Sequence, residues 1–550
     1  VALIMVVILL VLTRFWAIRT LEAPMWGDSV QHAAIAQLML DNGGLFNSWE
    51  PYAPYKSLTV QFGFPAAAAV FAWLSGVSNW QATLFTGQLV NILAVVALYP
   101  LVVRLSGSQW AGVAAVLMAG LISPIPAMYV NWGRYAQLMG QAILPAALWL
   151  LWISLEHPQQ PGQRRQTLVN ALPVLILSGF VLAGMSLSYY RMPFFYATFT
   201  LALLAGWGLP KWKASLLSWG GGAGKLAIIG ASAGLFCLPW VVHVMQGSVL
   251  AGLVQSGVEN SATWQNLLLD YQVWRNLNEY IPLTLQILAI FGLVYSLVRR
   301  KFMVAAIGLW VAGLASLVAL SLLRVPGTNL VQNFAIVISL YIPVSLVCGW
   351  LVGELTGTHP FQAKLGQAFI AAVLTGVAFW FAIDQRNLAQ PDTFALVTRP
   401  DMQAMAWMRD NTPADSLFLV EGFGIYGYSA VGSDAGWWLP LLAGRQNTIP
   451  PQYALMNEAP IDPDYSQNVA QLVGQLEQAQ VGAAESMGAL CQWGITHVYI
   501  GQRQGKASLD GPQLFSPEEF DQNPDFIQVY RKDRVHIYAL EQGACENHDG

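Results

Sequence analysis

Long apolar segments, separated by short polar loops, fill the first 384 residues of the chain. Each is close to the 20 or so residues that a helix needs to cross the hydrocarbon core of a membrane. Eleven segments qualify, near residues 1–19, 80–103, 109–127, 137–155, 168–187, 190–209, 224–246, 279–298, 302–323, 331–353 and 363–384. The pattern predicts a polytopic α-helical membrane domain over residues 1–384.

A further apolar stretch, Phe62–Val77, is shorter and rich in alanine, and we expect it to lie at the membrane interface without crossing. Lys and Arg collect in the cytoplasmic loops of membrane proteins. If Phe62–Val77 does not cross, the loops on one side of the membrane contain ten basic residues, which are Arg104, Arg164, Arg165, Lys211, Lys213, Lys225, Arg299, Arg300, Lys301 and Lys364. The opposite face is then extracytoplasmic, and we expect a multi-pass protein of the plasma membrane.

The composition changes after residue 384. Residues 385–550 carry 20 acidic and 9 basic side chains, against 10 acidic and 17 basic ones before them. Their pattern predicts helices over 400–411 and 469–479 and from Ser516, and strands over 416–421, 495–500, 526–530 and 535–540. We expect a soluble, extracytoplasmic α/β domain over residues 385–550.

Composition narrows the class of protein. Only 10% of the residues are charged, whereas soluble domains carry about 25%. This excludes a cytosolic enzyme, and neither part is basic enough to suggest a nucleic-acid partner. Four cysteines exclude a disulfide scaffold, and Cys491 and Cys545 are either bridged or free.

Two loops on the extracytoplasmic side are longer than a helical bundle needs. The first, 20–61, contains a predicted amphipathic helix over Ser29–Leu40, and the second, 247–278, holds Glu259 and Asp270. Long loops in compact proteins are usually functional or disordered. We therefore look for chemistry in these loops.

Asp28 is the strongest candidate for catalysis because it follows the first predicted span and precedes the amphipathic helix. A carboxylate there can act as a general base, or it can simply cap the helix. His32, four residues later, lies on the same helix face. It is a supporting candidate or a structural hydrogen-bonding residue.

Three arginines end up on the same side as Asp28, and they are Arg134, Arg191 and Arg324. Arginine binds phosphate bidentately, although an arginine beside aromatic rings at a membrane interface can also be merely structural. Asn131 and Tyr135 flank Arg134 as supporting candidates. Together these residues suit a lipid-linked phosphate.

An acidic residue after the first span, an interfacial helix behind it and many spans with an outer C-terminal domain resemble the GT-C glycosyltransferases. That resemblance implies a sugar donor linked to a polyprenyl phosphate or pyrophosphate, Asp28 as the base and the three arginines as phosphate ligands. Residues 434–448 also resemble a stretch of oligosaccharyltransferase catalytic subunits, which implies acceptor-side roles. The residues concerned are Asp434, Trp437, Trp438 and Arg445.

The sequence departs from oligosaccharyltransferases in two places. Gly432-Ser433 stands where that family has a paired tryptophan that helps to hold the acceptor peptide. The loop with Asn131 and Arg134 lacks the family's Asp-x-Asp pair. A hard divalent cation prefers carboxylate ligands, so we expect no essential metal and no other cofactor, although Asp28 with Glu259 or Asp270 leaves a cation site open.

Three functions remain in order of preference. The first is a membrane glycosyltransferase that transfers a sugar from the polyprenyl-linked donor to an extracytoplasmic glycan, lipid or protein. The second is a GT-C-like scaffold whose active site has decayed and which holds membrane-protein partners together. The third is a lipid flippase or transporter, which is disfavoured because the sequence shows no internal repeat and nearly all of its charges lie at the ends of the predicted spans.

Overall fold

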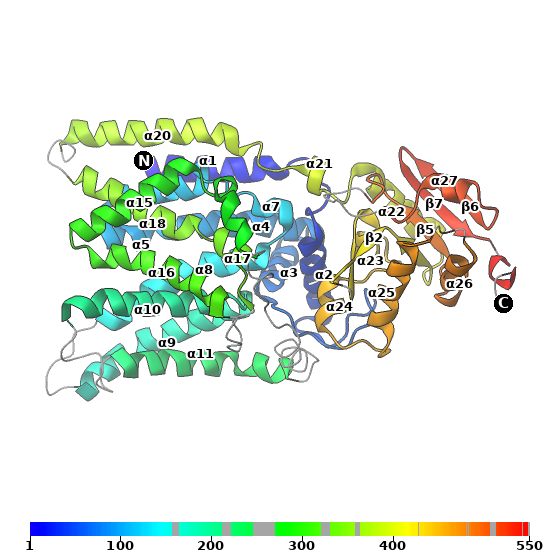
Figure 1. Cartoon of the computed structure of the whole chain (residues 1–550), viewed down its shortest axis with the longest axis horizontal. Coiled ribbons are helices and arrows are strands. Elements are labelled where there is room, and N and C mark those ends of the chain that lie inside the picture. The colour runs from blue at the N-terminus through cyan, green and yellow to red at the C-terminus, as the bar shows by residue number, and fades with distance from the viewer. Residues whose placement is uncertain are drawn as a thin grey trace.

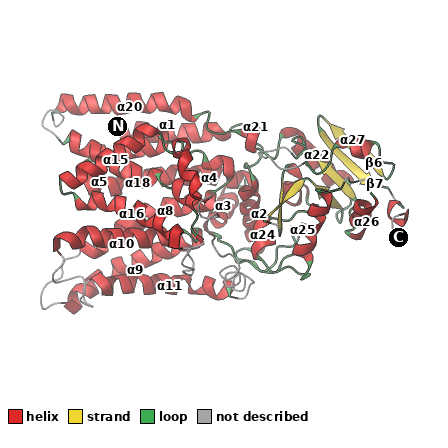
Figure 2. Ribbon diagram, in the orientation of Figure 1, coloured by secondary structure: helices red, strands yellow, loops and turns green. Residues whose placement is uncertain are grey.

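The computed structural model describes residues 1–156, 164–211, 222–245, 270–320, 330–357, 363–426, 428–479, 481, 483–505, 513–541 and 543–547. Long helices run side by side and form a bundle at one end of the molecule (Figure 1). The strands lie in the region at the other end (Figure 2). The chain thus combines a helical membrane part with a C-terminal α/β region.

The bundle contains a helix in each of the eleven predicted segments. In chain order its helices are α1 (Ala2–Ile18), α4 (Asn79–Val96), α5 (Leu98–Ser106), α6 (Gln109–Leu117) with the π-helical turn η1 (Met118–Ile122), α8 (Tyr135–Glu156), α9 (Arg164–Ser188), α10 (Met192–Lys211), α11 (Gly222–Val244), α15 (Leu283–Val298), α16 (Phe302–Ala319), α18 (Tyr341–Thr356) and α20 (Lys364–Gln385). The last of them ends beside the boundary expected after residue 384.

Length and composition give fewer certain spans than eleven. Among the described residues, seven helices are long and apolar enough to cross a membrane. The number is eight if the segments Gln272–Tyr280 and Leu283–Val298, which meet at an angle of 103°, form one span. Helices α1, α3 (Gly63–Ser75), α6 with η1, and α10 are apolar but shorter. The count of eleven spans and the division of the chain at residue 384 stay predictions.

A buried charge joins four helical elements inside the bundle. Arg14 of α1 is 2% exposed. Its guanidinium donates to Asn91 Oδ1 on α4 at 2.7 Å, to the Gly120 carbonyl of η1 at 2.7 Å and to Gln385 Oε1 on α20 at 2.9 Å. A charge within a membrane segment is costly unless it is paired or hydrogen-bonded. Three acceptors from three elements meet that requirement here.

Short helices cover the end of the bundle that faces the α/β region. They are α2 (Gly27–Asn42), α3 (Gly63–Ser75), α7 (Tyr129–Trp132), η2 (Gln272–Asn276), α14 (Leu277–Tyr280), α17 (Asn333–Val337) and α21 (Pro391–Phe394). Helix α2 runs across the bundle axis between the two parts (Figure 1). At about 1.5 Å per residue, the 13 residues of α3 reach roughly 20 Å, short of the 30 Å or so of hydrocarbon. Its interfacial placement stays a prediction.

The α/β region is built on a five-stranded mixed sheet in the order β4-β1-β5-β7-β6. Strands β4, β1 and β5 are parallel, and β7 and β6 continue the sheet antiparallel. A separate antiparallel pair is formed by β2 and β3. The strands are β1 (Leu417–Val420), β2 (Gly422–Ile425), β3 (Ser429–Gly432), β4 (Gln446–Asn447), β5 (His497–Ile500), β6 (Phe526–Lys532) and β7 (Val535–Leu540).

Helices pack on both faces of the sheet. They are α22 (Arg399–Asn411), η5 (Ala435–Trp438), α23 (Leu439–Ala443), α24 (Gln452–Asn457), α25 (Tyr465–Leu476), α26 (Ala484–Gln492), α27 (Pro517–Asp521) and η6 (Ala544–Asn547). Phe418 and Val420 enter one core with α22, whereas Leu419 enters the other with α25 and α26. The predicted helices and strands of this region are confirmed, with the ends shifted by a few residues. Strands β2, β3 and β4 were not predicted, because each has only two to four residues.

The first long outer loop belongs to this region structurally. Its residues Lys56 and Pro54 exchange backbone hydrogen bonds with Ala459 and Ile461 at 2.8 and 2.9 Å. The buried carboxyl of Glu458 accepts from the Thr59 amide at 2.7 Å. Apolar residues of α2 share one core with those of η5 and α23. Helix α2 is therefore fixed between the bundle and the sheet.

Cys491 and Cys545 form a disulfide that joins the end of α26 to η6 across 54 residues. A cross-link over a loop of that length restricts the unfolded chain and stabilises the folded one by roughly 2–4 kcal/mol. We expect Cys491→Ser, Cys545→Ser and the double variant each to lose that amount from the α/β region. Hydrogen exchange of β5 and α26 in the full chain measures it. Dithiothreitol should weaken the wild type only, and free thiols at both positions in the untreated protein would contradict the bridge.

Candidate active site

Asp28 lies in the first turn of α2, next to an unusual backbone conformation. Trp26, the N-cap residue, has φ 59° and ψ 175°, and its amide donates to the Phe394 carbonyl at 3.0 Å. A non-glycine residue at positive φ is strained unless its surroundings hold it. Because Trp26 is the N-cap residue and the helix begins at Gly27, Asp28 lies inside the helix. No side chain forms a capping hydrogen bond to α2. The interpretation of Asp28 as the N-cap is wrong.

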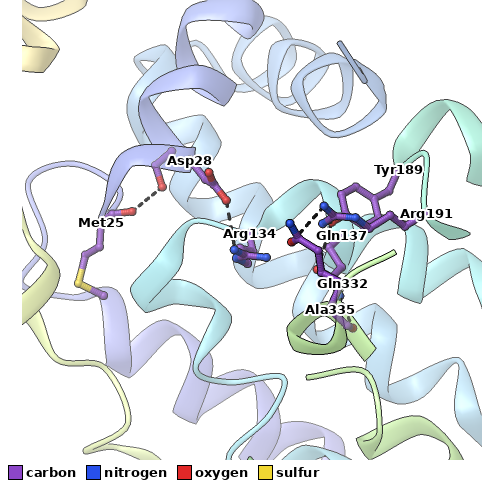
Figure 3. Close-up of polar contacts among 9 residues, drawn as sticks. Met25, Asp28, Arg134, Gln137, Tyr189, Arg191, Gln332 and Ala335 are labelled. Carbon is purple, nitrogen blue, oxygen red and sulfur yellow. Dashed lines mark hydrogen bonds and ion pairs between the residues drawn. The ribbon is translucent and has the colours of Figure 1, made fainter. Parts of the chain in front are cut away.

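A close approach between two segments brings Arg134 to Asp28. Helix α7 ends at Gly133, which has φ +65°. A Cβ on Gly133 would lie 2.2 Å from Ser29 Oγ and 2.7 Å from the Ser29 amide nitrogen. Only glycine allows both the left-handed conformation and this contact. The next residue, Arg134, places its Nε 3.9 Å from Asp28 Oδ2, with both side chains a little more than a quarter exposed (Figure 3).

Arg191 extends toward the same region from the turn between α9 and α10 (Figure 3). Its Nε donates to the Leu330 carbonyl at 2.6 Å, and its Nη atoms donate to the hydroxyl of Tyr189 and to Gln332 Oε1. These bonds hold the guanidinium in place and still leave donors, because arginine has five N–H groups. Arg134, by contrast, has its guanidinium carbon 4.8 Å from the Phe334 ring centroid.

Tyr453, from the start of α24, completes the surroundings of Asp28. Its amide donates to Gln31 Oε1 on α2 at 3.0 Å. Burial raises the pKa of Asp28, while the charges of Arg134 and Arg191 and the Tyr453 hydroxyl lower it. Tyr453 could not be found from the sequence, because it lies 422 positions from its partner Gln31 and belongs to no motif.

The supporting candidates have structural surroundings. His32 is fully buried against the rings of Phe64 and Tyr453. Neither ring nitrogen has a hydrogen-bond partner among the described residues, and burial lowers the pKa of His32 to about 3. The imidazole is thus neutral at physiological pH. Tyr135 stacks on Phe64 at 5.0 Å between centroids.

Asn131 ties the linker after α20 to the loop that carries Arg134. Its Nδ2 donates to the Leu388 carbonyl at 2.8 Å, and its Oδ1 accepts from the Gln390 amide at 2.9 Å. With both ends of its amide engaged, Asn131 positions the arginine loop against the linker that leads into the α/β region.

Two predicted site residues, Arg324 and Glu259, lie outside the described residues. Asp270 accepts from the backbone and side-chain nitrogens of Asn333 at 3.1 and 2.9 Å, which anchors α17. In the part of the chain that the structure describes, no three His, Cys, Asp or Glu side chains are grouped to hold a metal ion. The expectation of no essential metal stays an expectation.

The acceptor-side candidates are packed inside the α/β region. Asp434 is buried and accepts from the amides of Gly436 and Gly501, each at 2.8 Å. Trp438 is fully buried, and Arg445 donates to Thr412 Oγ1 and to the backbone carbonyls of Thr412 and Arg409. These three residues hold the domain together in this structure, and a direct acceptor contact stays a prediction.

Trp437 is the acceptor-side candidate that lies beside Asp28. A Cβ on Gly27 would lie 2.8 Å from its ring, and one on Gly432 would lie 2.4 Å from its Cγ. The ring is therefore enclosed by two glycine backbones, and its Nε1 donates to the Pro450 carbonyl at 3.1 Å. A tryptophan at position 432 would overlap it.

No protein-family model and no curated protein matches the chain. Solved structures match it in fold. The match to the oligosaccharyltransferase of Archaeoglobus fulgidus in the apo form covers 92% of this chain and 70% of that protein, with a TM-score of 0.56 and 14% sequence identity. ArnT from Cupriavidus metallidurans bound to undecaprenyl phosphate covers 98% of both chains, with a TM-score of 0.55 and 14% identity.

The match to a third solved structure, arabinofuranosyltransferase AftD from Mycobacteria, covers 98% of this chain and 40% of that protein, with a TM-score of 0.56 and 14% sequence identity. All three are GT-C glycosyltransferases. The predicted GT-C-like fold is confirmed, and so is the likeness of this chain to an oligosaccharyltransferase. At this identity, the comparisons show the fold.

Buried carboxyls near Asp434 make the α/β region sensitive to pH. Burial, with the charge of Asp434, raises the pKa of Glu421 to about 8, and burial raises the pKa of Asp434 to about 7. Between about pH 4 and pH 8, the folded chain therefore holds protons that the unfolded chain has released. Stability falls as pH rises through this window.

We expect Glu421→Gln to reduce the loss of stability between pH 5 and pH 9 by roughly 4 kcal/mol, because the amide keeps an acceptor for the Leu514 amide but cannot ionise. Denaturant unfolding of the full chain at both pH values measures the change. An unchanged pH dependence in this variant would show that Glu421 is not the group that titrates.

Proposed function

We propose that the chain is an integral membrane glycosyltransferase, which transfers a sugar from a polyprenyl phosphate or pyrophosphate donor to an extracytoplasmic acceptor. The observation that carries the proposal is the Asp28 carboxylate held 3.9 Å from Arg134, at the junction of the helical and α/β parts of a GT-C fold. Arg191 extends toward the same junction (Figure 3). One potential base and two cations thus lie together.

The reaction assigns a task to each group. An acceptor hydroxyl attacks the anomeric carbon of the donor sugar, and its proton passes to Asp28. The bond between the anomeric carbon and the phosphate oxygen breaks, and the polyprenyl phosphate leaves with the additional negative charge. Arg134 and Arg191 stabilise that charge, which is the kind of electrostatic stabilisation that contributes most in enzymes.

The solved relatives support a lipid-linked donor. The archaeal oligosaccharyltransferase has been solved with a dolichol phosphate and ArnT with undecaprenyl phosphate. For this chain we place the α/β region on the extracytoplasmic side, because the predicted cytoplasmic loops carry the basic residues. The phosphate of the donor would then lie at the outer interface, between the described arginines, with Arg324 as a further candidate.

A base must be ionised to accept a proton, and Asp28 has a pKa set by opposing effects. Burial raises the pKa of the Asp28 carboxyl, and the charges of Arg134 and Arg191 lower it. A base whose pKa lies near the working pH combines ionisation with the ability to hold a proton. The ion pair with Arg134 therefore serves both the base and the donor phosphate.

We expect Asp28→Asn to lower the rate of sugar transfer by two to four orders of magnitude, roughly the range for loss of a general base. Asn conserves the shape of the side chain but accepts no proton usefully. Transfer from a radiolabelled polyprenyl-phosphate sugar to endogenous acceptors in membranes measures the rate. The matched control is Asp41→Asn at the other end of α2, which should keep full activity.

An active Asp28→Asn variant would remove the carboxylate from the mechanism. A wild-type chain that transfers no sugar from any polyprenyl-linked donor would overturn the enzymatic function. That second result would favour the scaffold, an alternative that already has one observation behind it: the arginine loop contains Asn131, engaged with the linker, where oligosaccharyltransferases have carboxylates.

We expect Tyr453→Phe to shift the acid limb of the pH–rate profile to higher pH. The Tyr453 hydroxyl lowers the pKa of Asp28, so its removal leaves less of the carboxylate ionised at a given pH. The effect should be largest on kcat/KM at low pH and small where Asp28 is fully ionised. Unshifted profiles would indicate that Tyr453 does not act on the base.

A further inference from the structure

A second candidate binding site lies away from Asp28, at the β4 edge of the five-stranded sheet. It is a groove of about 440 Å³ between the first outer loop, helix α25 and the end of α26. The volume falls within the range of roughly 300–1,000 Å³ for small-molecule sites. Its lining differs from such sites because it is mostly polar.

Helix α25 contributes an uncharged polar face to the groove. Asn468, Gln471 and Gln475 line it, while Val469, Leu472, Val473 and Leu476 of the same helix are buried. None of the three amides makes a side-chain hydrogen bond to another described residue. A side-chain amide has two donors and an acceptor, so this face offers unused donors and acceptors side by side.

Aromatic rings lie next to these amides. Tyr465, at the start of α25, and Trp493, after α26, are 5.9 Å apart between ring centroids and both line the groove. Tyr52 from the outer loop lines another side, with its hydroxyl bonded to Asp41 at 2.9 Å. Aromatic faces carry partial negative charge and match the weakly positive C–H groups on the flat face of a sugar ring.

The charges of the groove exclude an anionic ligand. Among the described residues, its lining contains the carboxylates of Glu50 and Asp462 and no lysine or arginine. A phosphate or a uronic acid would find no cation there. Unbonded amides, aromatic faces and a few carboxylates are the groups that bind the hydroxyls and ring faces of a neutral sugar.

The groove is connected to the candidate active site by a short segment of chain. Pro450 lines the groove, and Tyr453, three residues later, faces Asp28. Three residues span at most about 11 Å. The Pro450 carbonyl also accepts from Trp437, whose ring packs on Gly27. One rigid segment thus contributes to both sites.

We infer that this groove binds neutral sugar residues of a glycan acceptor whose reacting end lies at Asp28. The inference rests on the proposed function for the identity of the acceptor, which is then a glycan and not a peptide. The groove would hold the part of the acceptor beyond the reacting sugar, so it would set the chain length and the class of glycan that the enzyme extends.

The test is binding without catalysis. Purified full-length protein in lipid nanodiscs is applied to an array of neutral hexose and pentose oligomers, uronic-acid and sulfated oligomers, and peptides. We expect neutral oligomers to be retained, and Gln471→Ala/Gln475→Ala to weaken that binding roughly tenfold or more, from the loss of two amide hydrogen-bonding groups. The matched control is Gln467→Ala/Gln478→Ala, which removes two exposed amides outside the groove and should bind like the wild type.

The Asp28→Asn variant separates the two proposals. It should bind neutral oligomers normally while failing to transfer sugar. Normal transfer together with groove-dependent glycan binding would overturn the catalytic role and leave the groove intact. Retention of only sulfated oligomers or peptides, no retention at all, or equal binding by the groove and control variants would overturn the groove.

Discussion

The contact between the Gly133 backbone and Ser29 is the constraint on which the candidate active site depends. Two segments about a hundred residues apart approach so closely that a single Cβ would prevent it. That approach places Arg134 beside Asp28, and Trp437 fixes α2 from the opposite side through Gly27. Gly133 and Gly27 thus allow close packing at two places around the first turn of α2. This packing sets the positions of Asp28 and Arg134. The strained Trp26, bonded to the linker at Phe394, adds a third restraint on the same turn.

The site is a property of the junction and of neither part alone. The bundle supplies Arg134 and Arg191, the first outer loop supplies Asp28, and the α/β region supplies Tyr453. The first outer loop is bonded into the sheet region through Glu458 and through the backbone at Lys56, while Asn79 of α4 donates to the Ala33 carbonyl of α2, so α2 is held by both parts. Under the proposed function, a sugar acceptor and a lipid-linked donor would approach Asp28 from two structurally different walls, one in the α/β region and one in the helical bundle.

Elements with a periodic or continuously apolar pattern could be predicted from the sequence, as the helices found in the predicted apolar segments and the β6–β7 hairpin show. The placement of Asp28 and Arg134 on one side followed from counting spans. Residues whose role depends on distant contacts could not be found: Tyr453 meets α2 across 422 positions. The capping role considered for Asp28 failed because Trp26, at positive φ, begins the helix two residues earlier. His32 was placed on the correct helix, but only the fold shows that it is enclosed by aromatic rings and that its ring nitrogens have no hydrogen-bond partner among the described residues.

The hydrogen bonds of Arg14 have a consequence for how the chain is made. Its acceptors on α4 and η1 are synthesised soon after α1, but Gln385 follows 371 residues later. At roughly 5–20 residues per second, a ribosome needs on the order of 20–75 s to reach it. During that interval the first helix carries a cation whose hydrogen bonding is incomplete, and the last helix of the bundle must insert beside the first to finish it. The hydrogen bonds of Arg14 can thus be complete only after the last helix of the bundle has been made, shortly before the α/β region.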